Sequence, residues 1–376
     1  MWKDSNIGKC FDLYSGNTPS RMEKKHFIGD VNWITSGELK EHYIGDTKER
    51  ISEKAAEDNN LRILPVGTFV MAIYGLEAEG VRGTCSITVK TSTISQACMA
   101  FTPKSNVSNE FLYSWYKKHG NKIGIRYAQG TKQQNLSYDI IEKFPIRYPS
   151  IEEQEKLNTF ISLLDKRIAT QNKIIEDLKK LKVAIIEKVF SEKKCNYKIG
   201  DVISQVSIRN KSKKETNILS VSNKWGFVEQ SEQFEDRIVA SEDITNYKVV
   251  RTNDFAYNPA RINVGSIARL KRYESGIVSP MYICFHSQNA LLPEYLELFF
   301  YTLYFKHEMY KRLEGSVRLC LSFEGLTNIP IFIPEITTQR EISIKVNSIE
   351  TKIGIEETYL NALKDQKQYL LKHMFI

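Results

Sequence analysis

The chain lacks the short motifs that commonly mark nucleotide-binding and metal-dependent enzymes. It contains no G-x-x-x-x-G-K-[ST] loop, no G-x-G-x-x-G turn after a predicted strand and no H-E-x-x-H motif. The six histidines are scattered without an acidic or cysteine partner at ligand spacing, and no Asp…Glu-x-Lys set of nuclease type falls on adjacent predicted strands. These absences argue against a catalytic chain and predict no metal site and no catalytic residues.

Paired cysteines and long apolar runs are also missing. The six cysteines form no C-x-x-C pair, which favours reduced thiols over a zinc site or a disulfide framework. The start "MWKDSNIGKC" lacks the apolar core of a signal peptide. The most apolar stretch, "LLPEYLELFFYTLYF", contains Pro and Glu and is too short to cross a membrane. We therefore expect a cytoplasmic protein without membrane contact.

The overall composition is that of a folded, mildly basic chain. The chain has 376 residues, of which 41% are hydrophobic and 26% charged. A folded chain of this length is expected to form two or three domains. The formal net charge of +8 fits an anionic partner, although charge alone is a weak indicator.

A sequence repeat at an offset of 185 residues organises the chain. "LSYDIIEKFPIRYPSIEEQ" (136–154) and "LSFEGLTNIPIFIPEITTQ" (321–339) share seven of nineteen positions, including both prolines and the final glutamine. Each segment leads into a predicted long helix, with Ser150 and Thr337 as the expected N-caps. The chain thus contains two copies of one structural unit.

Both predicted helices carry the same apolar seam. From Leu157 and from Ile342, ten positions follow at steps of four and three, and eight of the ten are apolar in each copy. The polar exceptions coincide at Gln171/Glu356 and Lys182/Lys367, and each run closes with a phenylalanine, Phe190 and Phe375. A mean step of 3.5 residues is the seam of a coiled coil, and each helix would be roughly 50 Å long. We expect the two helices to pair with each other rather than to lie singly on a globular core.

A mixed segment of strands and short helices precedes each long helix, in the same order but with divergent sequence. The prediction is therefore an α+β protein with an internal pseudo-twofold repeat and two long helices paired as an antiparallel coiled coil. The expected domains are a first recognition domain (1–150), a first long helix (151–191), a second recognition domain (192–335) and a second long helix (336–376).

One stretch bears on an alternative function. "YNPAR" (257–261) is similar to the Asn-Pro-Pro-aromatic loop of adenine methyltransferases, but Ala260 and Arg261 replace the last two residues. Two alternatives stay open at this point: a self-sufficient DNA adenine methyltransferase or nuclease, and a coiled-coil scaffold protein.

The whole layout resembles the specificity subunits of type I restriction–modification systems. The resemblance is carried by "SGNTPS" (15–20), "GDVNWITSGEL" (29–39), "GTKQQNLS" (130–137), "FPIRYPSIEEQEKL" (144–157) and "IPIFIPEITTQREI" (329–342). The second copy departs from the pattern, since "SQVSIRN" stands where Ser-Gly-x-Thr-Pro would be.

The resemblance implies a non-catalytic subunit whose two domains each read one half of a bipartite, asymmetric sequence in double-stranded DNA. It implies that the helices set the spacing and dock two modification (methyltransferase) subunits, to which restriction/translocase subunits are added. S-adenosylmethionine, ATP and Mg²⁺ would then belong to the partners, and this chain would bind no cofactor.

Polar and basic side chains in the variable loops are the candidates for DNA contact, because Arg, Asn and Gln pair with base edges and Lys neutralises phosphates. The predicted DNA-binding residues are Ser15, Asn17, Thr18, Lys24, Lys25, Thr35, Ser36, Tyr74, Arg82, Lys132, Gln133, Arg209, Asn210, Lys211, Asn223, Lys224, Tyr257, Asn258, Arg261 and Arg318.

Overall fold

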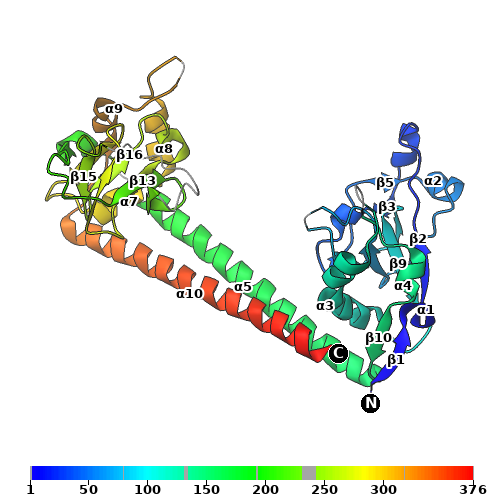
Figure 1. The fold of residues 1–376 in the computed structure, drawn as a ribbon. Coiled ribbons are helices and arrows are strands. Elements are labelled where there is room, and N and C mark those ends of the chain that lie inside the picture. The colour runs from blue at the N-terminus through cyan, green and yellow to red at the C-terminus, as the bar shows by residue number, and fades with distance from the viewer. Residues whose placement is uncertain are drawn as a thin grey trace. The chain divides into compact units, whose positions relative to one another are not determined.

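The computed structural model describes residues 2–78, 80–130, 134–191, 194–230, 243–316 and 318–375. The chain divides into two compact units. Unit 1 comprises residues 1–172 and 359–376, and unit 2 comprises residues 173–358. Each unit contains one globular part and a stretch of both long helices, α5 (Ile151–Ser191) and α10 (Ile336–Met374) (Figure 1).

Unit 1 contains two sheets that share its core. The larger sheet has the order β2-β9-β6-β7-β4, and the smaller has the order β5-β3-β8, in which β3 and β8 are parallel. A separate antiparallel pair joins β1 to β10 next to the start of α5. The strands are β1 (Lys3–Asn6), β2 (Phe11–Ser15), β3 (Val31–Ile34), β4 (Tyr43–Ile44), β5 (Arg50–Ile51), β6 (Phe69–Ala72), β7 (Cys85–Thr88), β8 (Ser92–Ile94), β9 (Cys98–Pro103) and β10 (Pro145–Tyr148).

The helices of unit 1 cover these sheets. The longest, α3, packs on the larger sheet through Phe111, Leu112 and Trp115, which are buried. The other helices of the globular part are short and frame the loops, and the full set with α3 is as follows. They are α1 (Ile7–Cys10), α2 (Glu53–Asp58), α3 (Asn109–Tyr127), α4 (Tyr138–Glu142) and the 3₁₀ turns η1 (Lys24–Phe27) and η2 (Ser36–Glu38).

Unit 2 repeats most of this topology, but its two sheets have four strands each, where those of unit 1 have five and three. One sheet has the order β12-β19-β16-β17 and the other β14-β13-β18-β15, in which β13 and β18 are parallel. The strands are β11 (Tyr197–Lys198), β12 (Ile203–Val206), β13 (Ile218–Ser222), β14 (Gly226–Glu229), β15 (Lys248–Arg251), β16 (Phe255–Tyr257), β17 (Ile267–Arg269), β18 (Ser275–Val278), β19 (Ile283–Ser287) and β20 (Pro330–Ile331). The helices are η3 (Ile199–Asp201), η4 (Ile262–Val264), α7 (Pro293–Phe300), α8 (Leu303–Tyr310) and α9 (Phe323–Thr327).

The repeat reaches further than the sequence comparison showed. Gly8 in α1 packs against Glu142 at the end of α4, and Gly200 in η3 packs against Thr327 at the end of α9. A Cβ atom at either glycine would lie 3.0 Å or less from the neighbouring Cβ, so only glycine fits without a shift. The α+β class and the internal repeat are confirmed.

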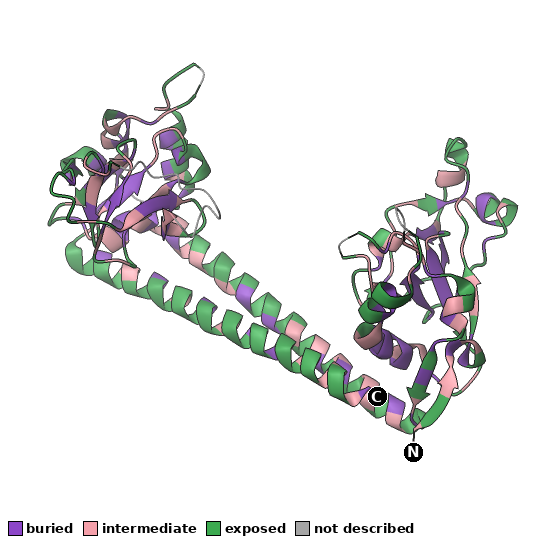
Figure 2. Ribbon diagram, viewed as in Figure 1, coloured by how far each residue is buried: buried purple, intermediate pink, exposed green. Residues whose placement is uncertain are grey.

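Within each unit the two long helices run antiparallel. In unit 1, Asp165 pairs with Lys367 and Arg167 donates to the Tyr359 hydroxyl. In unit 2, Lys182 lies 3.2 Å from Glu350 and Lys179 lies 2.7 Å from Glu357. All twenty predicted seam positions are buried or half-buried, whereas the outer faces are exposed (Figure 2). The predicted antiparallel coiled coil is therefore confirmed.

The helix starts are correct in one copy and shifted in the other. The Ser150 hydroxyl accepts from the Glu153 amide at 3.4 Å, as an N-cap does. The second helix begins at Ile336, so Thr337 lies inside it and its prediction as the N-cap was wrong.

Each long helix ends in the globular core of a unit. Phe190, near the end of α5, packs against Tyr295 and Phe299 in unit 2, while Phe375, just after α10, packs against Phe111 in unit 1. Both phenylalanines are buried. No helix in the described ranges is both long and apolar enough to cross a membrane.

Candidate nucleic-acid interface

In unit 1, two predicted segments meet where the parallel strands β3 and β8 end. The Ser95 amide donates to the Ile34 carbonyl at 2.9 Å, and the Asn17 amide donates to the Ile94 carbonyl at 3.3 Å. The indole of Trp33 donates to the Asn17 carbonyl at 3.2 Å. A Cβ on Gly16 would lie 2.0 Å from the Ile94 carbonyl oxygen, so this close approach needs glycine. "SGNTPS" and "WITSGEL" therefore form one surface.

Side chains on this surface divide into those that hold the loop and those that are available. Thr35 forms a capping box with Glu38, whose carboxylate accepts from its amide at 2.9 Å and its hydroxyl at 2.7 Å. Asn17 donates to the Asn59 carbonyl and accepts from the Thr18 amide. Ser15 is exposed, and Thr18 and Ser36 are half-buried. Ser15 is therefore the hydroxyl best placed for an outside partner, and the hydroxyls of Thr18 and Ser36 are partly accessible.

A second pair of loops in unit 1 lies beside the first. The Leu136 amide donates to the Ile73 carbonyl, and the Ile73 amide donates to the Ala97 carbonyl in the turn between β8 and β9, both at 2.9 Å. Arg82 donates to the Gln134 side chain at 3.0 Å, and Tyr74 is half-buried against the core. The predicted Lys132 and Gln133 lie outside the described residues.

Unit 2 brings equivalent loops together at the equivalent end of its sheets. Leu321 donates to the Pro259 carbonyl at 3.1 Å, as Leu136 does to Ile73 in unit 1. The loops before these leucines are closed by matched backbone bridges, Gln129 to Asn135 and Glu314 to Cys320. Their glycines have nearly equal positive φ angles, 117° at Gly130 and 114° at Gly315. Arg318 in the second loop is exposed.

The β13–β14 turn supplies the most prominent side chains of unit 2. Asn223 and Lys224 are exposed, and Trp225 is 72% exposed. The Lys224 ammonium lies 4.7 Å from the centroid of the Trp225 ring, a cation–π contact at the surface. Sequence reasoning missed Trp225, although an aromatic residue beside Asn and Lys in a predicted turn was a usable signal.

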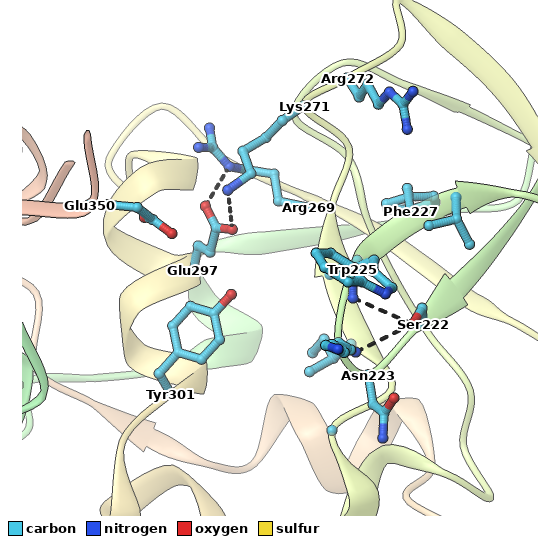
Figure 3. Close-up of a pocket in the computed structure, with 16 residues that line it drawn as sticks. Ser222, Asn223, Trp225, Phe227, Arg269, Lys271, Arg272, Glu297, Tyr301 and Glu350 are labelled. Carbon is cyan, nitrogen blue, oxygen red and sulfur yellow. Dashed lines mark hydrogen bonds and ion pairs between the residues drawn. The ribbon is translucent and has the colours of Figure 1, made fainter. Parts of the chain in front are cut away.

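A cavity of about 720 Å³ opens beside this turn (Figure 3). Its cations are largely neutralised inside the unit, because Glu297 accepts from Arg269 Nε at 3.0 Å and from Lys271 Nζ at 2.8 Å, and Arg269 also pairs with Glu294. Arg269 is therefore a structural residue of unit 2. Lys224, in contrast, makes no ion pair among the described residues and stays available to a phosphate.

The loop between β16 and β17 lies next to the turn. The Ser266 hydroxyl donates to the Val221 carbonyl at 3.1 Å, and the Asn258 amide donates to the Ser266 carbonyl at 3.1 Å. The Asn258 side chain accepts from the Ala260 amide at 3.1 Å and so holds the turn, while Arg261 points to the exposed surface.

Two predicted DNA-binding residues are not accessible, which corrects their assignment. Tyr257 is fully buried and its hydroxyl donates to the Leu321 carbonyl at 3.2 Å. Asn210 is 2% exposed and both ends of its amide bond the Glu215 backbone. The physical reason is that each side chain pairs with a buried or half-buried backbone group, and such a group costs free energy if it is left unpaired.

The remaining predicted cations are exposed but lie apart from these loops. Arg209 and Lys211 lie beside β15, at the opposite edge of the sheet from the β13–β14 turn, and Arg209 donates to Asn246 at 3.0 Å. Lys24 and Lys25 lie on η1, which contacts β5 at the edge of the smaller sheet of unit 1. They flank the candidate surface rather than form part of it.

Groups with catalytic character do not gather on either surface. The described residues contain no cluster of three His, Cys, Asp or Glu that could hold a metal ion. Burial raises the pKa of the Cys85, Cys98 and Cys284 thiols to about 12, so these thiols stay protonated near neutral pH. The arrangement can offer hydrogen bonds, positive charge and one stacking ring, which suits recognition of a polyanion.

Comparison with known proteins finds a family match for the first part of the chain. The type I restriction modification DNA specificity domain matches residues 1–180. A curated relative, the type I restriction enzyme MjaIX specificity subunit of Methanocaldococcus jannaschii, is 29% identical over 193 residues, which make up 50% of this chain and 44% of that protein.

Solved structures extend the likeness of fold to the whole chain. The type I S subunit from M. genitalium has a TM-score of 0.58 at 15% identity, with 100% of this chain and 96% of that chain covered. The HsdS subunit from Thermoanaerobacter tengcongensis has a TM-score of 0.55 at 16% identity, with the same coverage. The first part of the chain, residues 1–180, is thus similar to the type I restriction modification DNA specificity domain, and the doubled domain-and-helix plan of the whole chain has the fold of solved type I specificity subunits.

Proposed function

We propose that the chain is a non-catalytic DNA specificity subunit, in which each unit reads one half of a bipartite, asymmetric sequence. One observation carries this proposal: both units gather their loops at the same end of the same topology, yet present different side chains there. Unit 1 offers Ser15 and Ser36, whereas unit 2 offers Asn223, Lys224 and Trp225. Because base edges are distinguished by donor and acceptor pattern, unlike side chains on a common scaffold predict unlike half-sites.

The two alternative functions have less support. An adenine methyltransferase would need the Asn258 amide free for a base, but its oxygen accepts from the Ala260 amide at 3.1 Å within the turn. A scaffold protein would not require two surfaces of hydroxyl, amide and basic groups at equivalent ends of the sheets. Sequence-specific binding to duplex DNA accounts for both features.

The proposal includes two modification (methyltransferase) subunits, one for each unit. Unit 1 has a groove of about 560 Å³ along α5, lined by Phe160 and Leu163, which are 43% and 58% exposed. Unit 2 has a groove of about 600 Å³ lined by Ile185, Ile342 and Lys345. Phe160 and Lys345 are equivalent positions of the repeat. Exposed apolar grooves of this kind fit protein partners.

Restriction/translocase subunits complete the proposed assembly. S-adenosylmethionine, ATP and Mg²⁺ are assigned to those partners, so the chain itself would bind no cofactor and carry out no reaction. Its contribution is to choose where the complex acts.

A domain exchange tests the proposal. Residues 1–150 are replaced by the corresponding segment of another specificity subunit, the chain is expressed with its methyltransferase subunits, and methylated adenines are sequenced. We expect one half of the methylated sequence to change and the other half to stay, because the reading surface of unit 2 is untouched. Exchange of residues 192–335 is the reciprocal control. A change in both halves, or in neither, would contradict the assignment of one half-site to each unit.

A further inference from the structure

A buried glutamine joins the first turn of α5 to the globular part of unit 1. Gln154 is fully buried, and its side-chain oxygen accepts from the Ser108 amide at 3.0 Å, at the N-cap of α3. Its nitrogen donates to the Asn106 carbonyl at 2.8 Å and to the Pro149 carbonyl at 3.0 Å. The three bonds satisfy three of the four hydrogen-bonding positions of the amide.

Gln339 makes the same three bonds in unit 2. It is fully buried in the first turn of α10, and its oxygen accepts from the amide of Leu292, the N-cap of α7, at 2.9 Å. Its nitrogen donates to the Ala290 carbonyl at 3.0 Å and to the Pro334 carbonyl at 2.9 Å. In both units the acceptors are the residue two before the N-cap and the proline five before the glutamine.

Among the described residues, the following polar contacts between a long helix and a globular part differ between the units. In unit 1, Asn158 donates to the Ser108 hydroxyl at 3.3 Å and Asp165 lies 3.8 Å from His42. In unit 2, Glu187 accepts from the Leu303 amide at 2.8 Å. Two divergent surfaces that retain one identical joint indicate that the geometry of this joint is required in both units.

The hydrogen bonds of this joint depend on the angle between the groups that they connect, unlike the apolar packing around them. Ile161 and Leu164 of α5 also contact the core of unit 1, but apolar contacts tolerate sliding and rotation because hydrophobic burial has no preferred angle. Hydrogen bonds weaken steeply when they bend, and a buried polar group left unpaired is costly. The glutamine therefore fixes where, and at which angle, the helix leaves the globular part.

This geometry bears directly on a bipartite site. One base pair advances the duplex by about 3.4 Å, and one turn of about 34–36 Å takes 10–10.5 base pairs. A shift of a few ångströms between a helix and its reading surface is thus equivalent to one base pair of spacer. We propose that Gln154 and Gln339 are positioning residues that make the complex select a single spacer length, an inference that rests on the proposed function.

Methionine substitutions test this role, since methionine matches glutamine in length but forms no such bonds. The wild-type chain with its methyltransferase subunits is first used to identify its methylated sequence. Q154M and Q339M are then tested on plasmid libraries whose half-sites are separated by spacers from two base pairs shorter to two base pairs longer. Q366M, at an exposed glutamine on α10, is the matched control.

We expect each variant to keep both half-sites but to lower the preference for the correct spacer over its neighbours about tenfold, as loss of a few net hydrogen bonds implies. Hydrogen exchange should show faster exchange of the Ser108 amide in Q154M and of the Leu292 amide in Q339M. If methionine unfolds a unit, seen as loss of protection throughout its sheets, Q154N and Q339N replace it, because asparagine keeps the amide but cannot span the distance.

The outcomes separate the two claims. If the wild-type complex methylates no bipartite sequence, the proposed function fails before any variant is compared. If the wild type selects one spacer, and the variants lose amide protection yet keep that preference within about twofold, the positioning role is wrong.

Discussion

Single side chains tie the globular part of unit 1 to its stretch of α5, and His42 is a titratable residue among them. Its ring stacks between Tyr43 and Tyr113, and Nε2 lies 3.0 Å from Glu110, while Asp165 of α5 lies 3.8 Å from Nδ1. Burial by itself would lower the pKa of His42, but the carboxylates of Asp165 and Glu110 outweigh it, so the pKa lies above its usual value.

Because of this raised pKa, we expect the contribution of His42 to the stability of unit 1 to fall as the pH rises. The contribution of His42 is fully present below its unfolded pKa of about 6.5, and it is lost as the pH rises through the higher folded pKa. We expect H42Q to cost about 1 kcal/mol at pH 6 and little at pH 9, in urea unfolding of the full chain.

His119 provides the control for that measurement. Burial lowers the pKa of His119 to about 4, so its effect on stability lies below pH 6.5 and has the opposite sign. H119Q should leave the dependence between pH 6.5 and pH 9 unchanged. If H42Q cost the same free energy of unfolding at pH 6 and at pH 9, the charge of His42 would not stabilise its contacts with Asp165 and Glu110.

At the residue scale, the sequence indicated which turn side chains are exposed, but it did not indicate which polar side chains are used inside the fold. Asn223 and Lys224 were predicted and are exposed, because a short turn between two strands has no interior to enter. Tyr257 and Asn210 also carry hydrogen-bonding groups, yet each is buried and bonds a backbone group of its own unit. Whether a polar side chain faces inward depends on contacts with residues distant in the chain, which local sequence does not reveal.

At the scale of elements, the repeated seam determines how the helices pair. The matched polar interruption Lys182 is 23% exposed beside Glu350, whereas Lys179 and Glu357 form a more exposed pair. Ion pairs gain strength as water is excluded. The Lys182–Glu350 pair should therefore contribute more to the free energy of unfolding of unit 2 than the Lys179–Glu357 pair does.

Charge reversal measures this difference. We expect K182E to destabilise unit 2 by about 1–2 kcal/mol and E350K in the same chain to restore most of the loss. K179E, the exposed counterpart, should cost less than about 0.5 kcal/mol. Urea unfolding followed by helix circular dichroism provides the values. Equal costs for K182E and K179E would mean that the seam does not exclude water at Lys182.

On the scale of the whole molecule, each long helix begins in one unit and ends in the core of the other. α5 starts at the Gln154 joint of unit 1 and finishes with Phe190 in unit 2, while α10 starts at the Gln339 joint of unit 2 and is followed by Phe375 in unit 1. Phe375 is fully buried, and its carbonyl accepts from Lys118. Residues near position 375 therefore stabilise a domain that starts near position 2.

Reciprocal truncations test this connection. F375A should destabilise unit 1 by about 3–4 kcal/mol through the cavity it leaves, and hydrogen exchange should increase in α3 but not in α7. F190A should do the reverse, increasing exchange in α7 and leaving α3 protected. If F375A loosened α7 as much as α3, the assignment of Phe375 to the core of unit 1 would be wrong.

The sequence by itself determined the repeat, the class of fold and the pairing of the helices, because these depend on periodicity, prolines and glycines, which act locally. It also indicated the equivalent loops of the two units, through the turns at Gly130 and Gly315. The tertiary structure decided which side chains of those loops face outward, that Gln154 and Gln339 bond the start of another helix, and that Phe375 enters the core of unit 1. The physical reason is that a side chain's surroundings are made by segments up to 260 or so positions away, and only packing brings those segments into contact.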